Sequence, residues 1–148
     1  MHPTRRHVLV GLAAISVAGP AARAAALPPM KVWKDPNCGC CGAWVDHVRA
    51  AGFTVEVEEV RAMNQVKARL GVPADLASCH TAQVGGYVLE GHVPAEDVKR
   101  LLAEKPAGRG LAVPGMPQGS PGMETGVKDP YEVVLFRADG TRAVFAQR

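Results

Sequence analysis

The chain has 148 residues, of which 47% are hydrophobic and 21% are charged. Three of its 17 basic residues, Arg5, Arg6 and Arg23, lie within the first 26 positions, so the rest of the chain carries 14 basic and 14 acidic side chains. A formally neutral domain lacks the positive charge on which binding to nucleic acid depends, and we expect no nucleic-acid partner.

The N-terminus has the pattern of an export signal. Arg5 and Arg6 precede an apolar run over residues 8–22, which is followed by an alanine-rich stretch. The run is about 15 residues long, whereas a membrane-spanning helix needs roughly 20. We therefore predict a twin-arginine signal peptide over residues 1–26, export to the periplasm, no stable membrane anchor, and one domain over residues 27–148.

Hydrophobic periodicity and helix stop signals predict the elements of the first half of the domain. They are a strand at residues 30–33, a helix at 43–51, a strand at 53–60 and a helix at 62–70. Glycine follows each of these helices, at Gly52 and Gly71.

The second half is predicted to begin and end with β-hairpins. Strands at 81–84 and 87–90 flank a two-residue turn, Gly85-Gly86, and a third helix opens at Pro94. A stretch over 108–126, with six glycines and three prolines, is expected to be a loop. A final hairpin is predicted from strands at 131–136 and 143–146.

This order of elements predicts an α/β fold, a thioredoxin-like sandwich with a C-terminal β-hairpin extension. In that sandwich the turn after the first strand carries a Cys-x-x-Cys pair at a helix N-terminus, and the residues before the third strand pack beside it. Here the first position holds Cys38, Cys40 and Cys41, and the second holds Cys79. All four cysteines of the chain are thus expected at one place.

Crowded thiolates repel one another unless a positive centre or oxidation neutralises them. Soft-metal binding is the first hypothesis, and a redox disulfide between Cys38 and Cys41, read as Cys-x-x-Cys, is the second. Inert structural cysteines are the third reading. Cys40 points elsewhere on the same turn, which suits a thiolate that bridges two metal ions.

Histidines near Cys79 add candidate metal ligands. If Gly85-Gly86 is the hairpin turn, paired residue numbers sum to 171, and extending the ladder places Cys79 opposite His92. His80 points to the other face of a regular strand, so it is a ligand only if the strand is bulged or has not begun there. His47 lies about 10 Å along the helix from the cysteine turn and is expected to be solvated.

The glycine-rich loop supplies two further candidates, Met116 and Met123. Thioether sulfur is a soft ligand suited to Cu(I), and the loop is predicted to fold over the cysteines. A zinc ion would need only four ligands, Cys38, Cys41, Cys79 and a histidine, and would leave Cys40 idle. A polynuclear Cu(I) site uses every thiolate, and the cysteine spacing matches none of the usual iron–sulfur runs.

At these residues the chain resembles the CopG-type copper-resistance proteins, a bacterial domain-of-unknown-function family with a thioredoxin-like fold. The matching motifs are Asp35-Pro36-Asn37-Cys38-Gly39-Cys40-Cys41, Ser78-Cys79-His80-Thr81, Glu90-Gly91-His92-Val93-Pro94, Gly115-Met116-Pro117 and Gly119-Ser120-Pro121-Gly122-Met123-Glu124. The resemblance implies periplasmic copper binding in a cysteine-bridged cluster, with a redox role between Cu(I) and Cu(II). It also implies that the four cysteines are copper ligands.

The sequence therefore predicts a periplasmic copper-binding protein of copper resistance, which exchanges copper with other periplasmic copper-handling proteins. Its predicted metal ligands are Cys38, Cys40, Cys41, Cys79, His80, His92, Met116 and Met123. Whether the chain is also an enzyme, as a copper oxidoreductase, is left open. The alternatives are a thiol-disulfide oxidoreductase using Cys38 and Cys41, which would lack the usual proline beside its site, and a protein with a structural zinc site.

Overall fold

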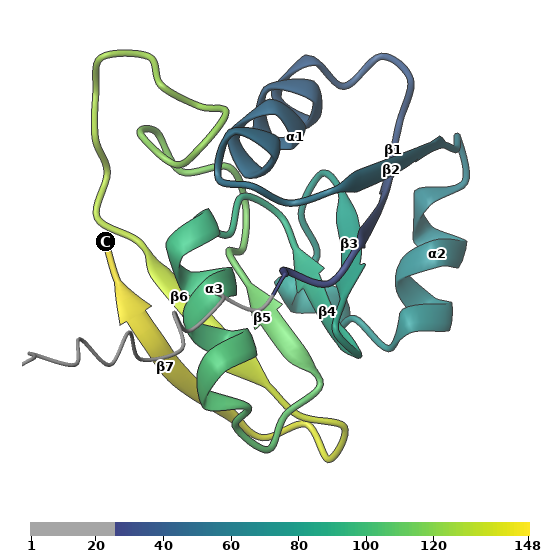
Figure 1. Ribbon diagram of the computed structural model, residues 1–148, viewed down its shortest axis with the longest axis vertical. Coiled ribbons are helices and arrows are strands. Elements are labelled where there is room, and N and C mark those ends of the chain that lie inside the picture. The colour runs from purple at the N-terminus through teal and green to yellow at the C-terminus, as the bar shows by residue number, and fades with distance from the viewer. Residues whose placement is uncertain (1–25) are drawn as a thin grey trace, which may run out of the picture.

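One seven-stranded sheet organises the chain in the computed structural model, which describes residues 26–148 (Figure 1). The strand order is β2-β1-β3-β4-β5-β6-β7, with β1·β2 and β4·β5 parallel and the other neighbours antiparallel. The strands are β1 (Met30–Lys34), β2 (Val55–Glu59), β3 (Thr81–Val84), β4 (Tyr87–Glu90), β5 (Gly110–Ala112), β6 (Glu132–Phe136) and β7 (Arg142–Gln147). The helices are α1 (Gly39–Ala50), α2 (Met63–Leu70), the short 3-10 helix η1 (Ala74–Leu76) and α3 (Ala95–Glu104).

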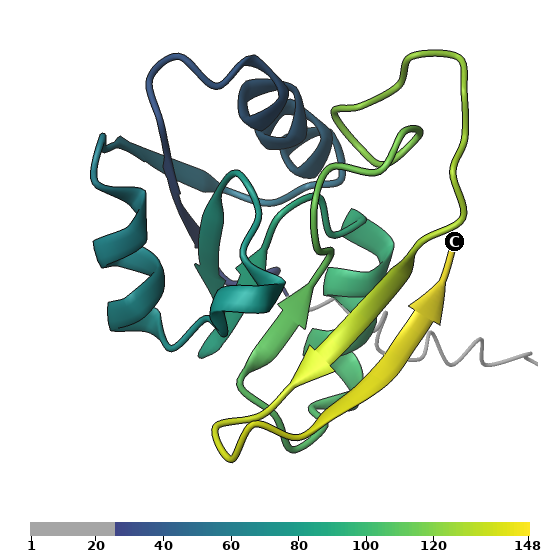
Figure 2. The same ribbon diagram turned by 180° about the vertical axis from the view of Figure 1, so that it is seen from behind.

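Helices cover both faces of the sheet. Helices α1 and α3 pack on one face, and α2 and η1 pack on the other. Figure 1 shows α3 in front of β5 and β6, and Figure 2 shows the same strands from behind. Successive strand residues alternate between the two cores: Val32 packs with α1 and α3, and Trp33 packs with α2.

The predicted α/β class and the central hairpin are confirmed. Val84 pairs with Tyr87 and Thr81 with Glu90, which is the register that the Gly85-Gly86 turn required. Both glycines have positive φ, 54° and 86°, which two-residue hairpin turns need and which other residues rarely adopt.

Two predicted boundaries are wrong. Helix α1 begins at Gly39, four residues before the predicted start at residue 43, so Cys40 and Cys41 belong to its first turn. The segment expected to be one loop over 108–126 contains strand β5. Gly110 makes this strand possible, because a Cβ there would lie 1.7 Å from the carbonyl oxygen of Val88 on β4.

The predicted signal peptide over residues 1–26 lies outside the described residues, apart from its last position. Within residues 26–148, every helix is too short or too polar to cross a bilayer.

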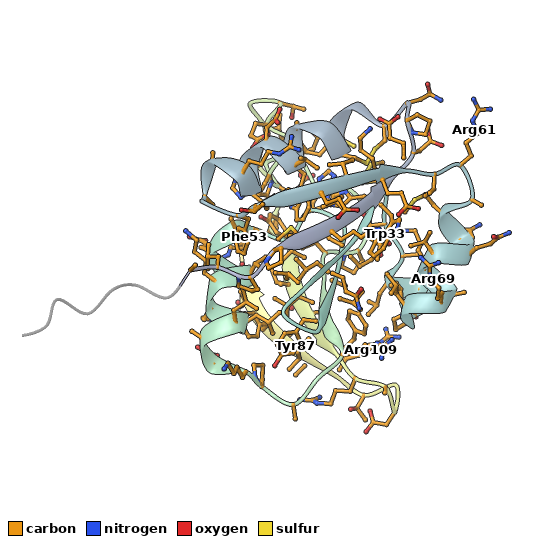
Figure 3. All side chains as sticks on the ribbon, turned by 45° about the vertical axis from the view of Figure 1, so that its right-hand side comes forward. Trp33, Phe53, Arg61, Arg69, Tyr87 and Arg109 are labelled. Atoms are coloured by element: carbon orange, nitrogen blue, oxygen red, sulfur yellow. A yellow bond between two sulfur atoms is a disulfide. The ribbon has the colours of Figure 1, made fainter. Side chains whose placement is uncertain are left out.

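Helix α2 is held to the sheet at its C-terminus. Arg109, which is labelled in Figure 3, immediately precedes β5. Its Nε donates to the carbonyl oxygen of Leu70 at 2.9 Å. Gly71 ends the helix with a left-handed φ of 74°. This contact links α2 to β5, the strand that lies beside β4.

The final arginine joins the last strand to α3. Arg148 donates from Nε to Asp97 Oδ2 at 3.0 Å and from Nη2 to Asp97 Oδ1 at 2.5 Å. The Asp97 side chain is only 1% exposed, so its charge depends on this bidentate partner.

We predict that Arg148→Ala lowers the free energy of unfolding by about 1–3 kcal/mol, because the buried carboxylate of Asp97 loses its partner. Urea unfolding followed by tryptophan fluorescence measures this, since Trp33 and Trp44 are both buried. Arg142→Ala is the matched control: its pair with Asp75 is largely exposed, so its loss should destabilise the protein much less than the loss of Arg148 does. Equal effects of the two variants would contradict the prediction.

Candidate metal centre

The cysteine turn is built from the end of β1 to the first turn of α1. Asn37 N donates to Asp35 Oδ1 at 2.8 Å, and Cys38 N donates to the carbonyl oxygen of Asp35 at 3.1 Å. Cys38 is the extended residue that precedes α1, and Cys40 and Cys41 follow within the helix. Free backbone N–H groups and the helix dipole favour anionic sulfur at this position.

Two of the four cysteines are joined. Cys38 and Cys41 form a disulfide, one of the three pairings that four cysteines allow, whereas Cys40 and Cys79 are free thiols. The disulfide is the pair that the sequence reads as Cys-x-x-Cys. The structure therefore shows the cysteine turn in its oxidised form.

The sulfur atoms of the two cysteine segments converge, as predicted. Cys40 Sγ lies 3.5 Å from Cys38 Sγ and 4.0 Å from Cys79 Sγ, although Cys79 is 39 residues further along the chain. All four sulfur atoms lie within 4.8 Å of one another. A zinc–thiolate bond is about 2.3 Å long, so two sulfurs on one such ion lie up to about 4.6 Å apart. The separations of Cys40 Sγ from Cys38 Sγ and Cys79 Sγ, 3.5 and 4.0 Å, lie within this limit, so these sulfurs can share a metal ion once the disulfide is reduced.

His92 lies against Cys79, as the extended hairpin register predicted. Its Nε2 is 3.1 Å from Cys79 Sγ. The ladder continues past Thr81 and Glu90 because Gly91 N donates to the carbonyl oxygen of His80 at 3.0 Å.

Hydrogen bonds fix which nitrogen of His92 can bind a metal. The Ser120 hydroxyl donates its single proton to the carbonyl oxygen of Pro117 at 2.6 Å. Its oxygen must then accept from His92 Nδ1, which is 3.1 Å away. Burial lowers the pKa of His92, which keeps the ring neutral. The lone pair of Nε2 is therefore directed toward Cys79 and available to a metal ion.

His80 also reaches the site. Strand β3 begins at Thr81, so the argument from a regular strand does not apply to His80, and its Nδ1 lies 3.5 Å from Cys79 Sγ. The ring is fully buried between Trp44 and His92, with ring centroids 4.3 Å and 5.5 Å away. Burial holds its pKa well below the ordinary value, and its Nε2 has no hydrogen-bond partner among the described residues.

The glycine-rich loop folds onto the cysteine turn, as expected. Gly122 has a φ of 92°, and a Cβ there would lie 2.6 Å from the carbonyl oxygen of Cys40. Met123 follows it and is partly buried, whereas Met116 is 52% exposed. The loop therefore lies at the site, and the roles of its two methionines as ligands stay predictions.

Two solved structures match the chain closely, under the titles "Copper resistance protein copG- Form 1" and "Form 2". Their identities to this chain are 46% and 47%, and their TM-scores are 0.78 and 0.77. Each match covers 82% of this chain and 98% of the solved one. The chain belongs to the CopG family of copper-resistance proteins. The resemblance predicted from the cysteine, histidine and glycine–methionine motifs is confirmed.

A narrower family match agrees with the CopG assignment. The family described as "Protein of unknown function, DUF411" matches residues 76–123, which hold Cys79, both site histidines and most of the glycine-rich loop. The comparison with curated proteins gives no match.

Sequence reasoning missed several polar residues around the CopG-family site. Ser120, which orients His92, lies within the glycine–methionine motif but was not predicted to contact the site. His47 was expected to be solvated, but it is partly buried and its Nε2 accepts a hydrogen bond from Ala95 N, at the start of α3, at 3.1 Å. Burial lowers the pKa of His47, which suits this acceptor role. The third omission is a buried Lys67–Glu90 pair beside Cys79.

The environment of Cys79 keeps its thiol protonated in the metal-free protein. Burial, and then the neighbouring Cys40, raise its pKa from the ordinary 9.0 to about 11. A metal ion that binds there must displace this proton, so affinity falls in acid.

We predict that alkylation of Cys79 in the metal-free protein keeps rising with pH up to about 11, because only the thiolate reacts. Peptide-mapped alkylation rates across pH measure this. The same rates in urea are the control, and their pH midpoint should lie near 9.0. A folded-state midpoint at or below the urea value would show that burial does not govern this thiol.

Proposed function

We propose that this member of the CopG family is a periplasmic copper-binding protein of copper resistance. The observation that carries the proposal is the convergence of four sulfur atoms, three from the start of α1 and one from Cys79, two residues before β3, within 4.8 Å. Sulfur-rich sites select Cu(I) over harder ions. The titles of the related structures name copper resistance, which supports copper as the ion bound.

Cys40 is the proposed bridge of a polynuclear copper site. Its sulfur lies near those of both Cys38 and Cys79, at 3.5 and 4.0 Å, so one thiolate can serve two ions. The proposed ligand set is Cys38, Cys40, Cys41, Cys79, His80, His92, Met116 and Met123. The imidazoles adjoin Cys79, and the methionines belong to the loop that lies over the cysteine turn.

The Cys38–Cys41 pair links copper binding to redox state. Reduction of the disulfide takes two electrons and two protons and yields two thiols, which can then bind copper. In the reverse direction, two thiolates that form the disulfide release two electrons, which suffice to reduce two Cu(II) ions to two Cu(I) ions. We propose that the thiolate pair reduces Cu(II) to Cu(I) in this way, and that an external dithiol, which is oxidised to its own disulfide, returns the Cys38–Cys41 disulfide to two thiols.

A thioredoxin-like core is part of the proposal. The order β2-β1-β3-β4, with α1 and α3 on one face and α2 on the other, supports it. Strands β5, β6 and β7 extend this core, so the proposed extension is larger than the hairpin of β6 and β7 alone. We also retain the signal peptide over residues 1–26, the domain over 27–148 and exchange with periplasmic copper-handling proteins as proposals.

A thiol-disulfide oxidoreductase is the second candidate function. The disulfide at the N-terminus of α1 favours it, because that position activates the attacking thiolate of such a pair. Cys79 then occupies the position where such enzymes usually have a proline, which argues against it.

Metal analysis of the reduced chain, purified without oxygen, separates these functions. The copper proposal predicts more than one copper ion per chain by elemental analysis. A single zinc ion in each chain would indicate a structural zinc site. Absence of metal together with dithiol reductase activity would establish the oxidoreductase and refute the copper proposal.

We predict that Cys40→Ser lowers the number of copper ions per chain and leaves the fold intact, because it removes the bridging thiolate but not the Cys38–Cys41 pair. Elemental analysis and circular dichroism measure the two effects. Asn37→Ser is the matched control, since this exposed side chain lies on the same turn. Unchanged copper stoichiometry in Cys40→Ser would refute the bridging role.

A further inference from the structure

A buried ion pair lies beside the cysteine site, on the face of the sheet that α2 covers. Lys67 Nζ, from α2, is 2.5 Å from Glu90 Oε1 at the end of β4. The Glu90 side chain is fully buried and that of Lys67 is 9% exposed. Thr81 joins them: it accepts from Lys67 at 3.0 Å and donates to Glu90 Oε2 at 2.6 Å.

The carboxylate of Glu90 also reaches the turn that carries Cys79. Glu90 Oε1 accepts a hydrogen bond from Ser78 N at 2.6 Å. A bond from a backbone N–H to a buried carboxylate is charge-assisted and about twice as strong as a neutral one. Ser78 immediately precedes Cys79, so this contact fixes the backbone on one side of the cysteine.

The other side of Cys79 is fixed as well. Gly91 N donates to the carbonyl oxygen of His80, and the Ser78 hydroxyl donates to the carbonyl oxygen of Gly115. Gly91 also packs tightly, since a Cβ there would lie 2.6 Å from Ser78 Oγ. The turn over residues 78–80 is thus held from β4 and from the glycine-rich loop.

Stability alone does not account for the buried pair. Removing two charges from water costs free energy that their attraction often fails to recover, so apolar residues of similar size serve a core equally well. What the pair supplies here is a carboxylate with all its hydrogen bonds satisfied, aimed at one backbone N–H beside the site.

We propose that Glu90 is a positioning residue that holds the Ser78–Cys79 backbone so that Cys79 Sγ faces Cys40 and His92, with Lys67 and Thr81 holding the carboxylate in place. The inference rests on the proposed copper function and deepens it. Groups of this kind, which orient a metal ligand without binding the metal, contribute roughly 10- to 100-fold to metal affinity.

Two variants separate the effect of the length of the Glu90 side chain from the effect of its charge. Glu90→Asp keeps the negative charge beside Lys67 but shortens the side chain by one methylene, which withdraws it from Ser78 N. The double variant Glu90→Gln with Lys67→Met removes both charges but keeps an amide oxygen at the position that accepts from Ser78. Asp97→Asn weakens the other buried carboxylate pair and is the control for general loosening.

The experiment measures Cu(I) affinity of the reduced proteins by competition with a chromophoric Cu(I) chelator. We expect Glu90→Asp to bind Cu(I) roughly 10- to 100-fold more weakly, and the double variant and Asp97→Asn to bind as the wild type does. Wild-type affinity in Glu90→Asp would overturn the inference. So would an equal loss in the double variant or in Asp97→Asn.

A second measurement needs no metal. In the metal-free reduced protein, peptide-mapped alkylation of Cys79 should be several-fold faster in Glu90→Asp than in the wild type, and unchanged in the double variant. Equal rates in all proteins would overturn the inference. If the wild type binds no copper, the proposed function fails, and these alkylation rates still decide whether Glu90 positions Cys79.

Discussion

The antiparallel pairing of β1 with β3 is the constraint on which the site depends. Trp33 pairs with Thr81, so β1 ends where β3 begins. The chain that leaves β1 turns directly into α1, and the residue two before Thr81 is Cys79. Backbone hydrogen bonds between two central strands therefore bring the two cysteine segments together. The ladder from β3 to β4 then adds His92 opposite Cys79.

The site combines a location that favours thiolate with one that opposes it. The cysteine turn lies at the N-terminus of α1, where the helix dipole favours anionic ligands in general. Burial has the reverse effect at Cys79, whose raised pKa keeps its proton until a cation replaces it. A bound metal ion stabilises the thiolates of both the cysteine turn and Cys79, because its positive charge neutralises several of them at once. The disulfide between Cys38 and Cys41 is the other way to remove the charge, and it is the state that the structure shows.

The sequence is informative where a local rule fixes geometry. The Gly85-Gly86 turn determines the hairpin register, and the two-residue period of strands carries that register out to His92. Contacts between distant segments follow no such rule. The sheet as a whole determines that three residues around Leu111 form a strand inside a glycine-rich stretch. It also determines that Ser120 reaches His92. The sequence did not predict a role for Glu90 because an acidic residue at a strand end usually faces solvent, whereas here it is fully buried and paired with Lys67 of α2.

The central claim is that sulfur from both cysteine segments binds copper together. Copper-edge X-ray absorption on the reduced, copper-loaded chain and on its Cys79→Ser variant tests it most directly. The account predicts a first shell dominated by sulfur, with copper–copper scattering, and fewer sulfur neighbours per copper in the variant. A shell of nitrogen and oxygen alone, or a sulfur shell identical in the two proteins, would contradict it.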